Sequence, residues 1–287
     1  MQHFHIPIIG SLGEDAPVWY REFHSQFYIS QLVNHALLSY MDTGIYRMTG
    51  IAPEQNKFEA HLDVVQCINE LIHNFSLRQI EQKEMLYCMG AELVGDGLIN
   101  RDMDINLDDL SSSLVEGNWH NIVKGYLNVW EFQFLFSISE STLKNVLGRK
   151  TEHERRKSKE IIKYFDTEFP DLFDFIEDNS NIDFDYASSV WAFYNKIRNL
   201  YSHSHGFFRV ENDGDIVKSI AKFRDAFDKF NRKDLLLNVI SLSGEDLFDK
   251  SGFQEGKFYL IGDNELNVFR NFIAEFVSSL AKYEKLS

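Results

Sequence analysis

The residues best suited to chemistry lie close together in the segment 195–208, whose sequence is NKIRNLYSHSHGFF. Within it, Arg198 and His203 are five residues apart at the end of an apolar, helical run. An arginine presents a fork of hydrogen-bond donors to a phosphate, and a histidine transfers protons near neutral pH. RNA supplies its own nucleophile, the 2′-hydroxyl group. This pair of side chains therefore suits cleavage of a phosphodiester bond without a metal ion, a cysteine or a serine.

The spacing of the two residues is only a weak signal by itself. On an unbroken α-helix, five residues turn the chain through about 140°, so Arg198 and His203 do not share a stripe. An arginine is long enough to lean towards the histidine, and Gly206 allows the helix to end there. In a chain of this composition, an arginine and a histidine five residues apart occur somewhere by chance with a probability of roughly 0.4. If an asparagine must also follow the arginine directly, as Asn199 does, the probability falls to roughly 0.03.

With the asparagine included, the segment resembles the RNxxxH motif of ribonucleases of the HEPN superfamily. Arg198, Asn199 and His203 match that motif, and the helical pattern over residues 119–287 is similar to the superfamily. No resemblance is found for residues 1–118. The resemblance implies a metal-independent endoribonuclease without a cofactor, typically a bacterial toxin or phage-defence effector in the cytoplasm. It also implies RNA as the substrate, a homodimer with a composite active site, and an antitoxin or activating protein as a further candidate partner.

The resemblance also implies roles for single residues. Arg198 is expected to bind and polarise the scissile phosphate, and His203 to act as general base or acid, leaving a 2′,3′-cyclic phosphate. Asn199 is expected to hold the arginine or the helix end by hydrogen bonding. Independently of the resemblance, we expect Ser202, His205 and Glu140 to support the site as its neighbours.

The two acids Glu131 and Glu140 interrupt an otherwise apolar helical segment. A buried carboxylate is costly unless a cation is paired with it. Each of the two therefore either faces solvent or meets a cation inside the protein, and one of them is a candidate to orient Arg198.

Other interpretations of the motif stay open. Arg198 could pair with the acidic stretch before its helix, and His203 could interact with the carbonyl groups at the helix end. A metal site at His203 and His205 lacks a third nearby ligand, so none is predicted. The main alternative function is a non-catalytic helical module for dimerisation or protein binding. Nucleotide binding beside a nucleotidyltransferase partner has less support, because the chain has no glycine-rich phosphate cradle.

The charge of the chain limits how it can meet RNA. The formal net charge is -15, which disfavours non-specific binding to phosphates over most of the surface. Residues 144–163 form a basic exception. They are either a solvated helix face or a phosphate-docking patch. The residues predicted to bind RNA are Arg149, Lys150, Arg155, Arg156 and Lys157.

Composition also favours a cytoplasmic protein. Cys67 and Cys88 are far apart and form no CxxC pair, which argues against disulfides and cysteine zinc sites. No stretch approaches the roughly 18 apolar residues of a membrane span, and no secretory signal is present. A spacing like that of an EF-hand calcium loop begins at Asp102. Leu107 stands where such a loop needs glycine and Ser113 where it needs glutamate, so no calcium site is predicted.

The chain is predicted to be all-α, because apolar residues recur at helical spacing and only four prolines occur. We expect two parts, a helical region of unknown role at 1–118 and an HEPN-like helical bundle at 119–287. A short extended segment, 258–261, is expected after a long loop with short helices. The predicted helices are 17–41, 57–75, 77–97, 120–148, 186–203 and 262–284, with a further one in the basic segment before Pro170.

Overall fold

The structure is a computed structural model that describes residues 15–49, 118–148, 157–180, 182–233 and 243–286. Over these residues the regular structure is helical, apart from one isolated antiparallel bridge between Phe207 and Phe258. The all-α prediction is therefore confirmed. The predicted helices 57–75 and 77–97, and the EF-hand-like spacing, lie outside the described residues.

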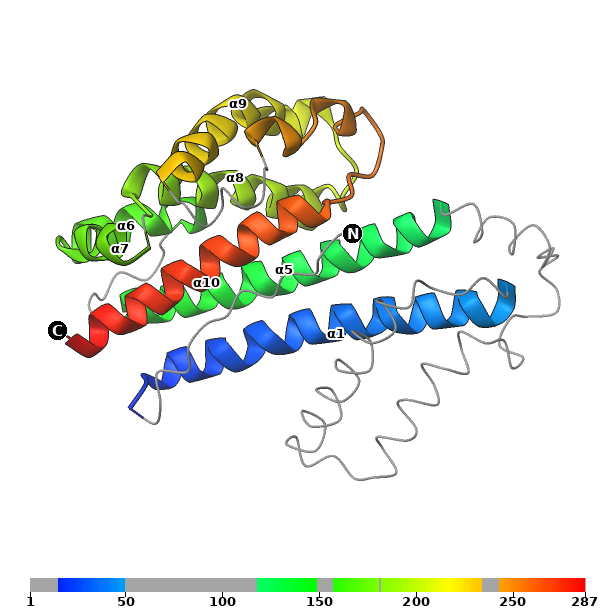
Figure 1. Cartoon of the computed structure of the whole chain (residues 1–287). Helices are drawn as coiled ribbons and strands as arrows, with labels where there is room; N and C mark the ends of the chain where they lie inside the picture. The colour runs from blue at the N-terminus through cyan, green and yellow to red at the C-terminus, as the bar shows by residue number, and fades with distance from the viewer. Residues whose placement is uncertain (1–14, 50–117, 149–156, 181, 234–242, 287) are drawn as a thin grey trace. The chain divides into compact units, whose positions relative to one another are not determined.

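The helices follow one another along the chain as Figure 1 shows. They are α1 (Val18–Thr49), α5 (Asn118–Gly148), α6 (Ile161–Glu168), α7 (Leu172–Ser180), α8 (Phe184–His203), α9 (Val210–Lys233) and α10 (Asp263–Leu286). Short 3-10 helices accompany them in the described part of the chain, namely η1 (Ser158–Glu160), η3 (Gly244–Asp246) and η4 (Lys250–Gly252). The helix with the RNxxxH motif is α8, and its end at His203 agrees with the prediction.

The contacts divide the chain into two compact units, residues 1–28 with 128–287, and residues 29–127. The first unit holds the start of α1, most of α5 and all of α6 to α10. Of the second unit, the structure describes the rest of α1 and the first residues of α5. The division predicted between 118 and 119 stays a prediction.

The segment after the motif differs from the prediction of a long loop with short helices. Val210–Lys233 forms one continuous helix, α9. Its buried apolar residues, spaced by four and three in turn, form a helical stripe. They are Ile216, Ile220, Phe223, Phe227 and Phe230. The prediction was wrong because this stripe is narrow and every position between its members is polar, valine or alanine.

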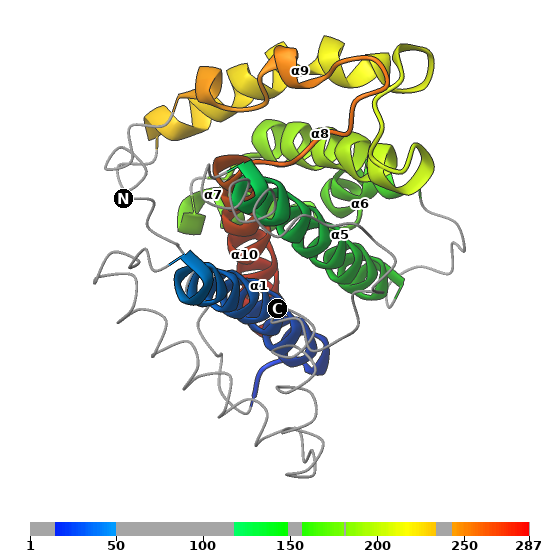
Figure 2. The ribbon, with the colours of Figure 1, turned by 90° about the vertical axis from the view of Figure 1, so that its right-hand side faces the viewer.

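Aromatic side chains hold α8 between its neighbours. On one side, Phe193 of α8 stacks on Phe223 of α9, with ring centroids 4.6 Å apart. On the other, Trp191 stacks on Phe136 of α5 at 4.7 Å, and Phe136 also stacks on Phe269 of α10. Figure 2 shows the same order, with α9 along one side of α8 and with α5 and α10 along the other. Close-packed aromatic contacts of this kind fix the rotation of α8 and hence the direction of its polar side chains.

A buried acid, Glu265, joins the loops at the start of α10. Its carboxylate accepts hydrogen bonds from the N–H groups of Phe248 (2.7 Å) and Gly262 (2.6 Å), and from the hydroxyl of Tyr259 (2.9 Å). Burial, opposed by these three donors, raises the pKa of Glu265 above its ordinary value of 4.5. Burial and the nearby Glu265 charge also raise the pKa of Tyr259, so its hydroxyl remains a donor.

Because the pKa of Glu265 is raised on folding, its effect on stability depends on pH. Between the unfolded and folded pKa values, the folded chain binds more protons, so the free energy of unfolding falls as the pH rises. The protonated acid gives its full contribution below about pH 4.5, and this contribution is lost as the pH rises through the folded pKa. We expect the free energy of unfolding in urea of the wild type to exceed that of Glu265→Gln by less at pH 8 than at pH 5. A larger difference at pH 8 than at pH 5 would contradict the direction of the pKa shift.

Candidate active site

Helix α8 begins and ends at defined residues. At its start, the side chain of Asp183 accepts a hydrogen bond from the N–H of Tyr186, which is an N-cap. At its end, the N–H groups of Ser204 and Gly206 both donate to the carbonyl of Leu200 (3.0 and 3.1 Å). His203 is the last helical residue. The motif therefore occupies the final turns of a regular helix.

Gly206 is required where the chain leaves α8. Its φ is +81°, and a Cβ atom there would lie 2.3 Å from the ring of Phe258. His205 also has a positive φ, 51°, a conformation that histidine adopts more readily than most residues. The N–H of Tyr259 then donates to the Gly206 carbonyl at 2.9 Å, which fastens this turn to the segment before α10. The predicted extended segment 258–261 takes part in the isolated bridge at Phe258 and forms no strand.

The motif arginine has an amide, not a carboxylate, as its partner. Arg198 is half-buried, and its guanidinium donates to Oδ1 of Asn199 at 3.1 Å. No ion pair of Arg198 is found with any described residue, including those of the acidic stretch before its helix. The predicted bond between Asn199 and the arginine is present. The alternative that Arg198 pairs with that acidic stretch therefore has no support.

The other motif residues are open to solvent. His203, Ser202 and His205 are all exposed. Because α8 is regular through His203, the helix separates Arg198 and His203 by about 140°. Within the described residues no hydrogen bond joins them. A single copy of the chain thus presents the two groups in different directions.

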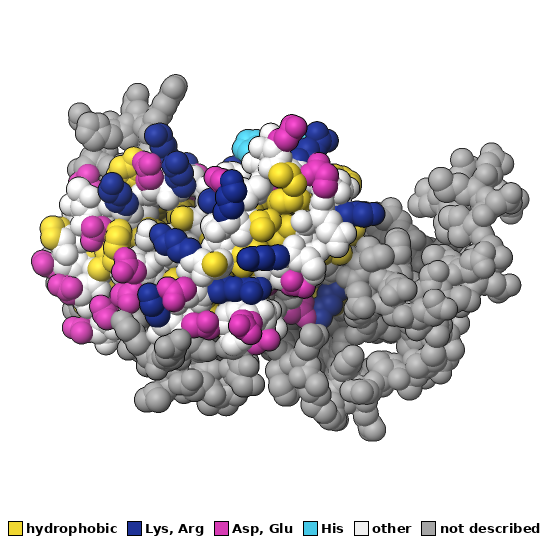
Figure 3. Space-filling model, turned by 90° about the horizontal axis from the view of Figure 1, so that it is seen from above, with side chains coloured by type: hydrophobic (Ala, Val, Ile, Leu, Met, Phe, Trp, Pro, Cys, Tyr) yellow, Lys and Arg dark blue, Asp and Glu magenta, His cyan; other side chains and the backbone are white. Residues whose placement is uncertain are grey.

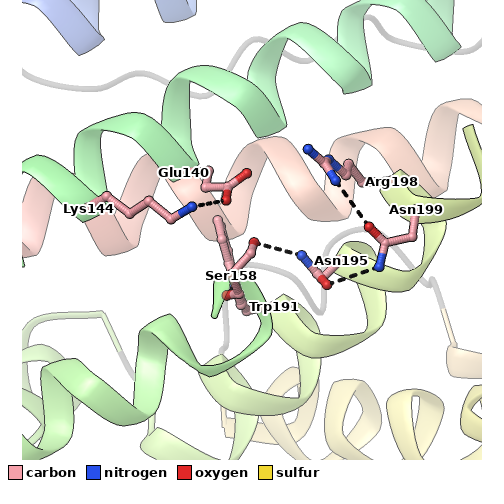
Figure 4. A network of polar contacts seen from close by, with 7 residues as sticks. All are labelled: Glu140, Lys144, Ser158, Trp191, Asn195, Arg198 and Asn199. Carbon is pink, nitrogen blue, oxygen red and sulfur yellow. Dashed lines mark hydrogen bonds and ion pairs between the residues drawn. The ribbon is translucent and has the colours of Figure 1, made fainter. Parts of the chain in front are cut away.

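Glu131 meets a different cation. Its carboxylate accepts from Nε of Arg270 at 2.6 Å and from a second nitrogen of the same guanidinium, and both side chains are buried. Of the two alternatives, Glu131 meets a cation inside the protein, and this cation is Arg270 rather than Arg198. Glu140 pairs with Lys144 one turn along α5. Figure 4 shows Glu140 and Arg198 extending from neighbouring helices, and no ion pair is found between them.

Two residues that sequence reasoning missed connect to the motif (Figure 4). The amide of Asn199 donates to Oδ1 of Asn195 at 3.5 Å, and the amide of Asn195 donates to Oγ of Ser158 at 2.7 Å. Asn195 is only 5% exposed. The indole N–H of Trp191 donates to the Ser158 carbonyl at 2.7 Å. The buried position of Asn195 within an apolar helix was the available signal, but its partner is 37 residues away in sequence.

Most of the residues predicted to bind RNA lie outside the described part of the chain. Arg149, Lys150, Arg155 and Arg156 lie outside the described residues, whereas Lys157 is exposed and precedes η1. Figure 3 shows Lys and Arg side chains along the middle of the face that α9 presents, with Asp and Glu among them. Basic side chains are therefore also present outside the predicted basic segment.

The His, Cys, Asp and Glu side chains of the described residues form no group of three that could hold a metal ion. An open depression of about 550 Å³ is lined by Arg209, Val210, Glu211, Glu255 and Gly256, and includes none of the predicted catalytic residues. No helix in the described ranges combines the length and the apolar character needed for a membrane span.

Comparison with known proteins adds no assignment. No protein family matches the chain, and no curated protein or solved structure is significantly similar to it.

Proposed function

We propose that the chain is a metal-independent endoribonuclease of HEPN type. In the proposed reaction, Arg198 binds the scissile phosphate and His203 removes the proton of the attacking 2′-hydroxyl group. The 2′-oxygen bonds to phosphorus, the bond to the 5′-oxygen of the next nucleotide breaks, and that oxygen takes up a proton. The products are a 2′,3′-cyclic phosphate and a 5′-hydroxyl. The resemblance extends the proposal to a cytoplasmic toxin or phage-defence effector of bacteria.

The observation that carries this proposal is the hydrogen bonding of Arg198. Arg270 and Lys144 each have a carboxylate partner, whereas the half-buried Arg198 bonds only to an amide within the described residues. A guanidinium has five N–H donors, and an amide oxygen uses one of them here. The positive charge thus remains available for an anion, and a phosphate matches its fork.

The direction of the two groups supports a homodimer. Arg198 and His203 diverge around α8, so one copy does not aim both at the same phosphate. A second copy related by a two-fold axis presents the same residues in the opposite sense. We therefore propose a composite site in which two motifs face one RNA strand.

The test is cleavage of mixed single-stranded RNAs by the purified protein in EDTA. We expect the wild type to cut and to leave 2′,3′-cyclic phosphate ends, and His203→Ala to lose at least about 100-fold in rate, because general acid–base catalysis contributes that much. Since His203 is exposed, the variant should unfold at the same temperature as the wild type. His24→Ala, which removes a histidine of α1 outside the motif, is the control. Equal cleavage by the wild type and His203→Ala would overturn the assignment.

A second candidate function has one specific observation in its favour. On α5, Trp130 is 63% exposed and Phe134, one turn later, is 44% exposed. Exposed aromatic side chains in a stripe are typical of surfaces that bind protein. If the folded protein leaves every RNA intact, a non-catalytic binding module that uses this stripe becomes the better account.

A further inference from the structure

A chain of polar side chains runs from the motif arginine into the protein. Its members are Arg198, Asn199, Asn195 and Ser158, and we call it the amide relay (Figure 4). The first three belong to α8 and the last to η1. The relay therefore ties the motif to a separate element of the fold.

The direction of every hydrogen bond in the relay is set by the arginine. A guanidinium only donates, so Asn199 must turn its oxygen towards Arg198 and its NH₂ towards Asn195. Asn195 must then present its own oxygen, which leaves its NH₂ to donate to Ser158. The last member has to be an acceptor, and a serine hydroxyl fulfils this requirement.

The far end of the relay is held firmly. Asn195 is buried, and its bond to Oγ of Ser158 is short, at 2.7 Å. The Trp191 indole, itself buried, donates to the backbone carbonyl of Ser158 at 2.7 Å. Ser158 thus has a fixed backbone and a hydroxyl aimed at the relay. The loosest link is the one from Asn199 to Asn195, at 3.5 Å.

We propose that Asn195 and Ser158 are positioning residues, which act through Asn199 to hold the guanidinium of Arg198 in the direction needed for phosphate binding in the transition state. The effect on catalysis rests on the proposed ribonuclease function. The effect on the orientation of the Arg198 guanidinium does not, because it follows from the hydrogen bonds alone. Loss of the hydroxyl at 158 leaves the Asn195 amide without its acceptor and loosens each later member of the relay.

The experiment compares Ser158→Ala with Ser158→Thr in the full chain. Both variants keep the backbone carbonyl that Trp191 uses, and only threonine keeps the hydroxyl. Ser251→Ala serves as a matched control, because it removes a hydroxyl from another 3-10 helix, η4, where the partner is Asp249. NMR measures the rate at which the guanidinium group of Arg198 rotates about its Nε–Cζ bond. The kcat and KM for RNA cleavage are measured on the same samples.

We expect faster guanidinium rotation in Ser158→Ala, and rotation at the wild-type rate in Ser158→Thr and in the control. We also expect kcat to fall about 10-fold in Ser158→Ala with little change in KM, because a misdirected group costs transition-state binding more than ground-state binding. The same pattern is expected for Asn195→Ala, provided that thermal unfolding shows it folded.

The outcomes separate this inference from the proposed function. Unchanged rotation in Ser158→Ala would overturn the relay, whatever the activity. Faster rotation with unchanged kcat would overturn its catalytic role. Faster rotation in a protein whose wild type cleaves no RNA would support the relay and contradict the ribonuclease proposal.

Discussion

Replacement of Arg198 by alanine is expected to lower the rate of RNA cleavage by at least about 100-fold, which is the usual effect of removing one donor to a developing oxyanion. Arg198→Lys should recover only part of this loss, because an ammonium keeps the charge but lacks the planar fork that contacts two phosphate oxygens. The fold should remain, since no carboxylate of the described residues pairs with Arg198 and would be left alone. The measurement is kcat/KM with a defined single-stranded RNA.

Lys196 provides the matched control for this prediction. It is a cation on the same helix, two residues away, and its ammonium donates to the Asp215 carbonyl (3.2 Å) and to the Ser219 hydroxyl (3.1 Å). Lys196→Ala removes one positive charge from α8 without touching the motif. If both alanine variants lose the same fraction of activity, the effect is one of general charge, and Arg198 has no special role.

The sequence was a good guide to α8 because its signals are local. The apolar spacing of the helix is regular, and Gly206 directly follows the motif. Gly206 is also the position at which a side chain would collide with Phe258. By contrast, α9 was missed because the residues between its buried stripe are mostly charged, so that the segment reads as a loop.

The partners of the polar residues could not be predicted, because they lie far away in sequence. The relay joins Asn195 to a serine 37 residues earlier, and Glu131 meets an arginine 139 residues later. A single sequence shows that a buried acid needs a cation, but it does not show which cation the fold brings near. For the same reason, the direction of Arg198 became clear only once α8 was packed between α5 and α9.

The largest expected effect on stability belongs to the pair of Glu131 and Arg270. Both side chains are almost fully buried, at 4% and 3% exposure, and they share two hydrogen bonds between α5 and α10. Glu131→Ala removes the carboxylate that forms two hydrogen bonds with the buried guanidinium of Arg270, which costs about 3–5 kcal/mol. Asn267 still accepts one hydrogen bond from Arg270, but an amide does not neutralise the charge. The measurement is the free energy of unfolding in urea.

Two further variants decide whether this cost comes from the loss of the Glu131 charge. Glu140→Ala breaks the pair with Lys144 on the same helix, α5, where the lysine is exposed, and should cost at most about 0.5 kcal/mol. The double variant Glu131→Leu with Arg270→Met removes both charges and fills the space with apolar atoms. It should recover most of the loss, because burying neither charge avoids both desolvation penalties. A double variant no more stable than Glu131→Ala would show that the packing of α5 against α10, rather than the charge, sets the cost.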